Sequence, residues 1–193
     1  MKSLWIVLGL VALLIFALVV GGGMYFSSKN QMVVKDQNVK AAFSQIDVDL
    51  QRRADLIPNL VATVKGYANV EETVLNNIAQ ARSGLLTAQT PNEKLAANDR
   101  LNVALLPLMR LQENYPQLKS NDQFMRLQDE LAGTENRIAV SRRRYNESIR
   151  EYNTFIQQFP NSIWANFAGF HPKDEYYTAD PGAKQAPKVD FSK

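Results

Sequence analysis

The chain has 193 residues, and 22 lysines and arginines nearly balance 19 aspartates and glutamates, for a formal net charge of +3. This small excess argues against nucleic acid as a partner, because phosphate binding depends on a clustered basic surface. The sequence contains no cysteine, which excludes disulfides, thiolate metal sites and a lipoprotein signal.

The amino-terminal segment is a long apolar run. Residues 4–26 contain no charged side chain, and Lys2 and Lys29 flank them. As a helix this segment spans roughly 34 Å, enough to cross a hydrocarbon core of about 30 Å. Trp5 lies near one end, where an amphipathic ring suits the headgroup region. We therefore predict a single-pass transmembrane anchor at 1–28, with the lipid bilayer as a partner.

A cleaved secretory signal is the alternative for this segment. It would have a short basic start and a small-residue cleavage site at the glycines of 21–23. The apolar run is long for a signal, which favours the anchor. Charge determines the orientation poorly, but a short basic start before an anchor usually stays inside. We therefore expect the domain at 29–170 to lie outside the cytoplasm.

The residues after the anchor have helical periodicity and are about enough for one domain. We predict that residues 30–57 continue the anchor as one helix, with one apolar stripe formed by Val39, Phe43, Ile46, Leu50 and Ile57. Pro58 predicts a kink or a new helix, because proline disfavours a helical conformation in the residue before it.

Capping-box signals predict the starts of three further helices. They pair Asn69 with Glu72, Thr90 with Glu93, and Ser120 with Gln123. The predicted helices cover residues 70–88, 91–114 and 121–159. Proline should end the last of these at Pro160, and residues 171–193 show no periodicity.

The helix predicted at 121–159 carries a strict repeat of seven residues. Such a repeat winds a helix around a partner in a left-handed coil, and the neighbour we expect is the helix at 30–57. The repeat consists of Phe124, Leu131, Ile138, Tyr145, Tyr152 and Phe159. The fold class is therefore all-α: a single-pass amino-terminal transmembrane helix, an antiparallel bundle of long helices at 29–170, and an irregular tail at 171–193.

Short motifs along most of the chain resemble the LemA family. They are QIDV at 45–48, RRADLIPNLV at 52–61, VKGYA at 64–68, ENYP at 113–116, GTENRI at 133–138, YN at 145–146 and FP at 159–160. Two positions depart from the family pattern. Phe43 stands where the family usually has tryptophan, and Val70 stands where it usually has histidine, so a metal or acid-base role at Val70 is doubtful.

The resemblance implies an all-helical, single-pass protein of the bacterial inner membrane with a poorly defined cellular role. A magnetosome-associated relative points to membrane organisation. The resemblance implies no established catalytic activity.

Residues that could support catalysis or metal binding are sparse. His171 is the only histidine, and no cysteine accompanies it, so a zinc site is not expected. Asp47 and Asp49 are two residues apart and point to different sides of a helix, so they cannot readily share a proton or a metal. We expect no catalytic residue, no metal and no cofactor.

Arginines are the most informative polar residues. Arg53 falls on the apolar stripe, so we expect it to be at least half buried and paired with a carboxylate. Arg142, Arg143 and Arg144 cover nearly a full helical turn. They favour either a solvated face or a surface for an acidic partner or anionic lipid. The full set of candidate interaction or structural residues is Arg52, Arg53, Asp55, Arg142, Arg143, Arg144, Tyr145 and Trp164.

These observations favour a membrane-anchored helical scaffold or assembly protein that forms a homo-oligomer and is not an enzyme. The alternative is a monomeric, membrane-tethered adaptor or regulator of another membrane protein, for example a protease. An enzyme is the third hypothesis and the least favoured.

Overall fold

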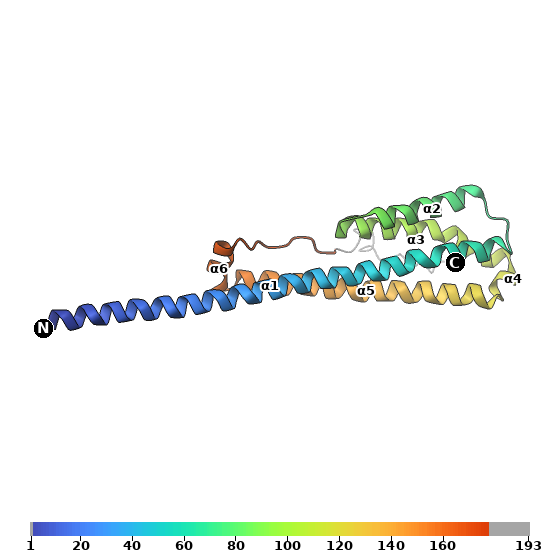
Figure 1. Ribbon diagram of the computed structural model, residues 1–193. Helices are drawn as coiled ribbons and strands as arrows, with labels where there is room; N and C mark the ends of the chain where they lie inside the picture. Colours follow the sequence, from blue (N-terminus) through green and yellow to red (C-terminus); the bar gives the residue numbers. More distant parts are fainter. Residues whose placement is uncertain (1, 178–193) are drawn as a thin grey trace, which may run out of the picture. The chain divides into compact units, whose positions relative to one another are not determined.

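The computed structural model describes residues 2–177, with side chains from residue 4 onward; the rest of the predicted tail lies outside this range. The described part is all-α and contains no strand, which confirms the all-α class predicted from the sequence (Figure 1). Its helices are α1 (Lys2–Lys65), α2 (Glu72–Thr87), α3 (Pro91–Asn114), α4 (Pro116–Lys119), α5 (Asp122–Gln157) and α6 (Asn161–Ala168). Residues 171–177 form no regular element.

Helix α1 is one continuous helix of 64 residues. The prediction that residues 30–57 continue the amino-terminal segment is confirmed. The idea that a new helix starts at Pro58 is wrong, because α1 runs through this residue to Lys65. Leu60 and Val64 are fully buried, so packing of the final turns helps to keep the helix intact beyond the proline.

The described residues fall into two compact units, and each is considered by itself. The first unit contains residues 2–42 and 144–174, and the second contains residues 43–143 and 175–177. Helices α1 and α5 therefore contribute to both units.

The second unit is a bundle of α1, α2, α3, α4 and α5. Helices α1 and α5 are antiparallel in it, because Asp49 of α1 bonds to Ser141 of α5 while Arg53 bonds to Glu135. This confirms the expected pairing of the long helix with residues 30–57. Helices α2 and α3 lie side by side (Figure 1). The core of this unit is mostly aliphatic and includes Ile46, Ile57, Leu60, Ile78, Leu101, Leu108, Leu118 and Ile138, together with Phe124.

The seven-residue repeat of α5 is mostly buried within the chain. Five of its six members are 5% exposed or less, whereas Phe159 is 82% exposed. Phe159 is not buried like the other members of the repeat, because α5 ends at Gln157, before this residue. The small seam residues Thr134 and Ser141 are also buried, as close approach of a neighbouring helix requires.

The helix starts agree with the capping signals at one of three places. The backbone N–H of Glu93 donates to Thr90 Oγ1 at 3.2 Å, and the backbone N–H of Thr90 donates to Glu93 Oε2 at 3.0 Å, so this capping box is confirmed. The backbone N–H groups of Gln89 and Thr90 both donate to the Glu93 carboxylate and lower the pKa of this group. The box predicted at Asn69 is wrong, because α2 begins at Glu72 without a side-chain cap.

The cap of α5 lies one residue later than the sequence indicated. Asn121 Oδ1 accepts a hydrogen bond from the backbone N–H of Phe124 at 2.8 Å. The predicted cap, Ser120, instead ends α4, and its hydroxyl donates to the carbonyl of Gln117 at 3.1 Å. The short helix α4, which the sequence did not reveal, therefore displaces the start of α5 by one position.

Candidate interaction site

Arg53 is buried in the second unit, on the same face of α1 as Ile46 and Ile57. Only 6% of the residue is exposed, and its guanidinium donates to the Glu135 carboxylate of α5 and to the Asn102 side chain of α3. The prediction of a buried arginine paired with a carboxylate is confirmed. The second partner was missed, because nothing in the sequence marks a neutral amide on an amphipathic helix as a ligand for a distant arginine.

A second buried polar pair lies one turn earlier on α1. Asp49 is 5% exposed and accepts a hydrogen bond from Ser141 Oγ at 2.8 Å. Asp47 faces elsewhere and pairs with Lys94 Nζ at 2.5 Å, so the two aspartates do not form a carboxylate pair. Sequence reasoning considered Asp49 only beside Asp47 and missed its role in the core.

Asn98 of α3 completes this buried polar layer. Lys94, one turn before it, contacts Asp47, and Asn102, one turn after it, contacts Arg53. Asn98 therefore lies at the level of Asp49. It is 1% exposed, and neither amide atom has a hydrogen-bond partner among the described residues. Directional bonds in an aliphatic core restrict which helix positions can face one another, so we interpret this layer as setting the register of α1, α3 and α5.

Arg52 and Asp55 lie on the exposed side of α1. Asp55 Oδ1 accepts a hydrogen bond from Gln51 Nε2 at 2.8 Å and lies 4.0 Å from the guanidinium of Arg82 in α2. Arg82 also donates from Nε to the backbone oxygen of Ala54 at 2.7 Å. Asp55 thus belongs to a contact between α1 and α2, whereas Arg52 is a surface cation.

The three consecutive arginines of α5 differ in exposure, as their spacing around the helix indicates. In the second unit Arg142 is half-buried, and its guanidinium lies 5.3 Å from the centre of the Tyr177 ring. Arg143 and Arg144 are exposed. The nearby carboxylate of Glu147 pairs with Arg150 at 3.2 Å.

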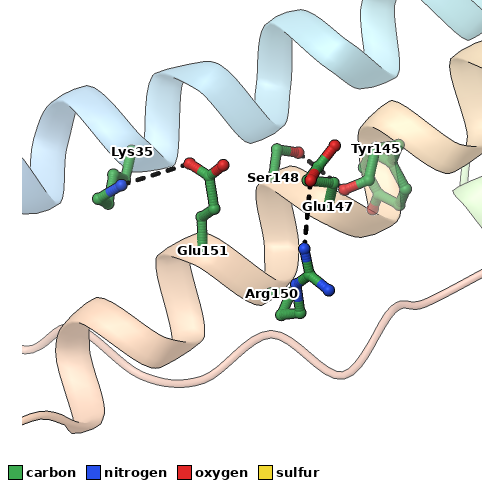
Figure 2. A network of polar contacts seen from close by, with 6 residues as sticks. All are labelled: Lys35, Tyr145, Glu147, Ser148, Arg150 and Glu151. Atoms are coloured by element: carbon green, nitrogen blue, oxygen red, sulfur yellow. Dashed lines mark hydrogen bonds and ion pairs between the residues drawn. The ribbon is translucent and has the colours of Figure 1, made fainter.

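In the first unit, Tyr145 is part of the core rather than a surface ligand contact. It is 2% exposed, and its carbonyl accepts a hydrogen bond from Ser148 Oγ at 2.7 Å. Figure 2 shows this bond beside the ion pair of Lys35 with Glu151, which are 3.4 Å apart. The glutamate of this pair is exposed, so the pair contributes little to stability, typically under about 1 kcal/mol.

Asp36 connects α1 to the segment after α6 within the first unit. Its carboxylate lies 2.8 Å from Lys40 Nζ and 2.9 Å from Lys173 Nζ. Burial raises the pKa of Asp36, but the hydrogen bonds and charges of the two lysines outweigh burial and lower it below its ordinary value. Burial, together with the charge of Asp36, raises the pKa of Tyr152, whose hydroxyl donates to the carbonyl of His171 at 3.0 Å.

Trp164 belongs to an aromatic cluster at the end of the apolar run. Its ring centre lies 5.7 Å from that of Tyr25, and Phe167 lies 5.9 Å from the same tyrosine on an edge-to-face contact. Helix α6 supplies both partners, and α1 supplies Tyr25. The candidate residue Trp164 therefore lies beside the predicted anchor.

A groove between α2 and α3 forms a concave surface in the second unit. Small side chains form much of its lining, which leaves room for another helix to approach. The lining includes Ala81, Gly84, Ala88, Ala96, Ala97, Val103 and Ala104. Sequence reasoning did not find this groove, since the small residues are spread over two helices with no distinctive spacing.

Within residues 4–177 no group of three or more His, Asp or Glu side chains is placed to hold a metal ion. Near its amino-terminal end, helix α1 is long and apolar enough to cross a membrane, by length and composition alone, and none of its apolar window is buried within the protein.

These features define an all-helical protein with paired long helices and one apolar amino-terminal helix that could span a membrane. Residues 42–191, most of the chain, match the family described as the LemA family. The chain belongs to the LemA family. In a search of curated proteins, no sequence matches this chain significantly.

Proposed function

We propose that this protein is a membrane-anchored helical scaffold that self-associates and has no catalytic activity. The observation that carries the proposal is that α1 exposes its apolar side chains in one part and buries them in another. Its apolar side chains from Leu4 to Val20 are exposed on all sides, whereas Met32, Val39 and Ile46 are buried against other helices. One helix therefore combines a surface suited to lipid with a surface packed against protein.

The same helix suits a single-pass protein of the bacterial inner membrane. No helix break separates the apolar run from the packed region, so the anchor and the domain are joined without a linker. The short basic amino terminus favours placing the domain outside the cytoplasm. This orientation can be tested by protease access in intact cells and in inverted vesicles.

We expect self-association to use a surface other than the seven-residue repeat, because five of the six members of that repeat are buried within the chain. The groove between α2 and α3 is the surface we propose. Val103, an exposed apolar side chain in the lining of this groove, would add buried apolar area when a helix of a second copy occupies it.

The test is the mass of the full-length protein in mild detergent, together with cross-linking in native membranes. Gly84 offers a way to block the groove, because a side chain added there meets no atom within 4 Å of its Cβ. We expect the wild type to contain several copies and Gly84→Trp to be a monomer. Ala139→Trp, at an exposed position of α5, is the control and should remain oligomeric. A wild type that is monomeric at all concentrations would contradict self-association.

The same groove also supports the adaptor hypothesis, in which a helix of another membrane protein occupies it. This hypothesis expects a monomer that binds one defined partner in stoichiometric amounts. Gly84→Trp should abolish that complex, and Ala139→Trp should not. The mass measurement therefore separates the two proposals before any partner is known.

A further inference from the structure

Helix α6 and the residues just before it expose large apolar side chains that no described part of the protein covers. Phe159 is 82% exposed, Ile163 is 54% exposed and Phe167 is 79% exposed. Single exposed apolar residues are common, but three large ones within nine residues form a patch that indicates contact with a partner or a membrane.

The position of this patch along α1 identifies the partner. Ser28 Oγ donates to Asn161 Oδ1 at 2.9 Å and ties the first residue of α6 to α1 two residues after the apolar run ends. Tyr25, in the last turn of that run, contacts both Trp164 and Phe167. These contacts all lie within the first unit, so α6 lies at the level where the apolar surface of α1 gives way to polar residues.

The chemistry at this level is that of a membrane interface. Tyrosine and tryptophan rings favour the headgroup region, where one part of the ring is apolar and the other polar. Lys29 Nζ lies 5.9 Å from the centre of the Tyr25 ring, so a cation is present at the same depth. A short helix with exposed aromatic residues can lie in the interface plane with its apolar face in the boundary between headgroups and acyl chains.

We propose that α6 is an interfacial membrane helix, whose side chains Phe159, Ile163 and Phe167 enter the outer part of a phospholipid bilayer. This inference rests on the proposed membrane anchoring of α1 and adds a second lipid contact to it. Two contacts at one interface would fix the depth of α1 and its rotation about its own axis, which a single apolar helix leaves free.

Tryptophan fluorescence of the full-length chain in phosphatidylcholine vesicles tests this proposal, because the protein has two tryptophans. A single reporter is placed on α6 by combining Phe167→Trp with Trp5→Phe and Trp164→Phe. Lipids brominated near the headgroup should quench this reporter by about half, lipids brominated near the chain ends should quench it much less, and acrylamide should have little effect. Strong acrylamide quenching without lipid quenching would overturn the proposal.

Two further single-tryptophan proteins make the outcomes distinguishable. Trp164→Phe leaves Trp5 on the anchor, and its quenching by brominated lipid shows that α1 is inserted. Val103→Trp with Trp5→Phe and Trp164→Phe places a reporter on exposed α3, where we expect quenching by acrylamide alone. If Trp5 is quenched by lipid and the reporter at Phe167 is not, the α6 proposal fails while the anchor stands. A reporter at Phe167 shielded from both quenchers would indicate a protein neighbour and would also overturn the proposal.

Discussion

Arg82 of α2 donates a hydrogen bond from Nε to the backbone oxygen of Ala54 in α1, at 2.7 Å. In an unbroken helix this oxygen would accept from the backbone nitrogen of residue 58, but that residue is proline and has no N–H. Arg82 therefore replaces the missing helical bond from outside the helix. This hydrogen bond explains why Pro58 does not end α1.

Arg82→Ala should lower the free energy of unfolding by about 1–2 kcal/mol, because it leaves a buried carbonyl without a partner. In a Pro58→Ala background the same change should cost under about 0.5 kcal/mol, since the new backbone N–H supplies the bond. Denaturant titration of the detergent-solubilised chain measures both values. Arg110→Ala, on the exposed face of α3, is the control. Equal costs in the two backgrounds would show that Arg82 does not act through Ala54.

Arg53→Ala should cost about 3 kcal/mol, because it removes two hydrogen bonds from the core and leaves a cavity. Arg53→Met keeps most of the stem and should cost only about 1–2 kcal/mol, since the Glu135 side chain, 41% exposed, can turn to water. The same titration with Arg52→Ala as the exposed neighbour should show a change under about 0.5 kcal/mol. Near-wild-type midpoints for both Arg53 variants would place this arginine at the surface.

Asn98→Leu should raise the free energy of unfolding by about 1 kcal/mol. The Asn98 amide is 1% exposed and has no hydrogen-bond partner among the described residues, so its burial is costly, and leucine has a similar branched shape. The control is Asn76→Leu on the exposed face of α2, which should be nearly neutral. A loss of stability on Asn98→Leu would mean that this amide makes a polar contact that the fold requires.

The Asp36 carboxylate should make the free energy of unfolding depend on pH in the acidic range. Its pKa is lowered in the folded state, so its contribution is fully present above the ordinary aspartate value of about 4 and is lost as the pH falls through the lowered folded value. Asp36→Asn should therefore reduce stability at neutral pH, and the difference from wild type should shrink in acid. Chemical denaturation at a series of pH values measures this difference, and a constant difference at every pH would contradict the assignment.

Local patterns in the sequence were sufficient for much of this fold. The apolar run at 4–26, the stripe from Val39 to Ile57 and the repeat from Phe124 to Tyr152 each depend on spacing along one helix, and the structure contains these helices. The Thr90 cap is equally local, because its two hydrogen bonds join residues three apart. Arg53 was predicted as buried for the same reason: its place on the apolar stripe follows from helical periodicity alone.

Only the tertiary structure decided which distant groups meet. Nothing near Pro58 indicates that Arg82 supplies its missing bond, and nothing near Asp49 indicates Ser141, 92 residues away. The position of α6 against Tyr25 likewise depends on the return of the chain along α5, since residues 161–168 carry an apolar pattern but no signal of what they face. Secondary structure follows from interactions between neighbours in sequence. These contacts depend on how whole helices pack, which is set by the summed burial of many side chains on several helices at once.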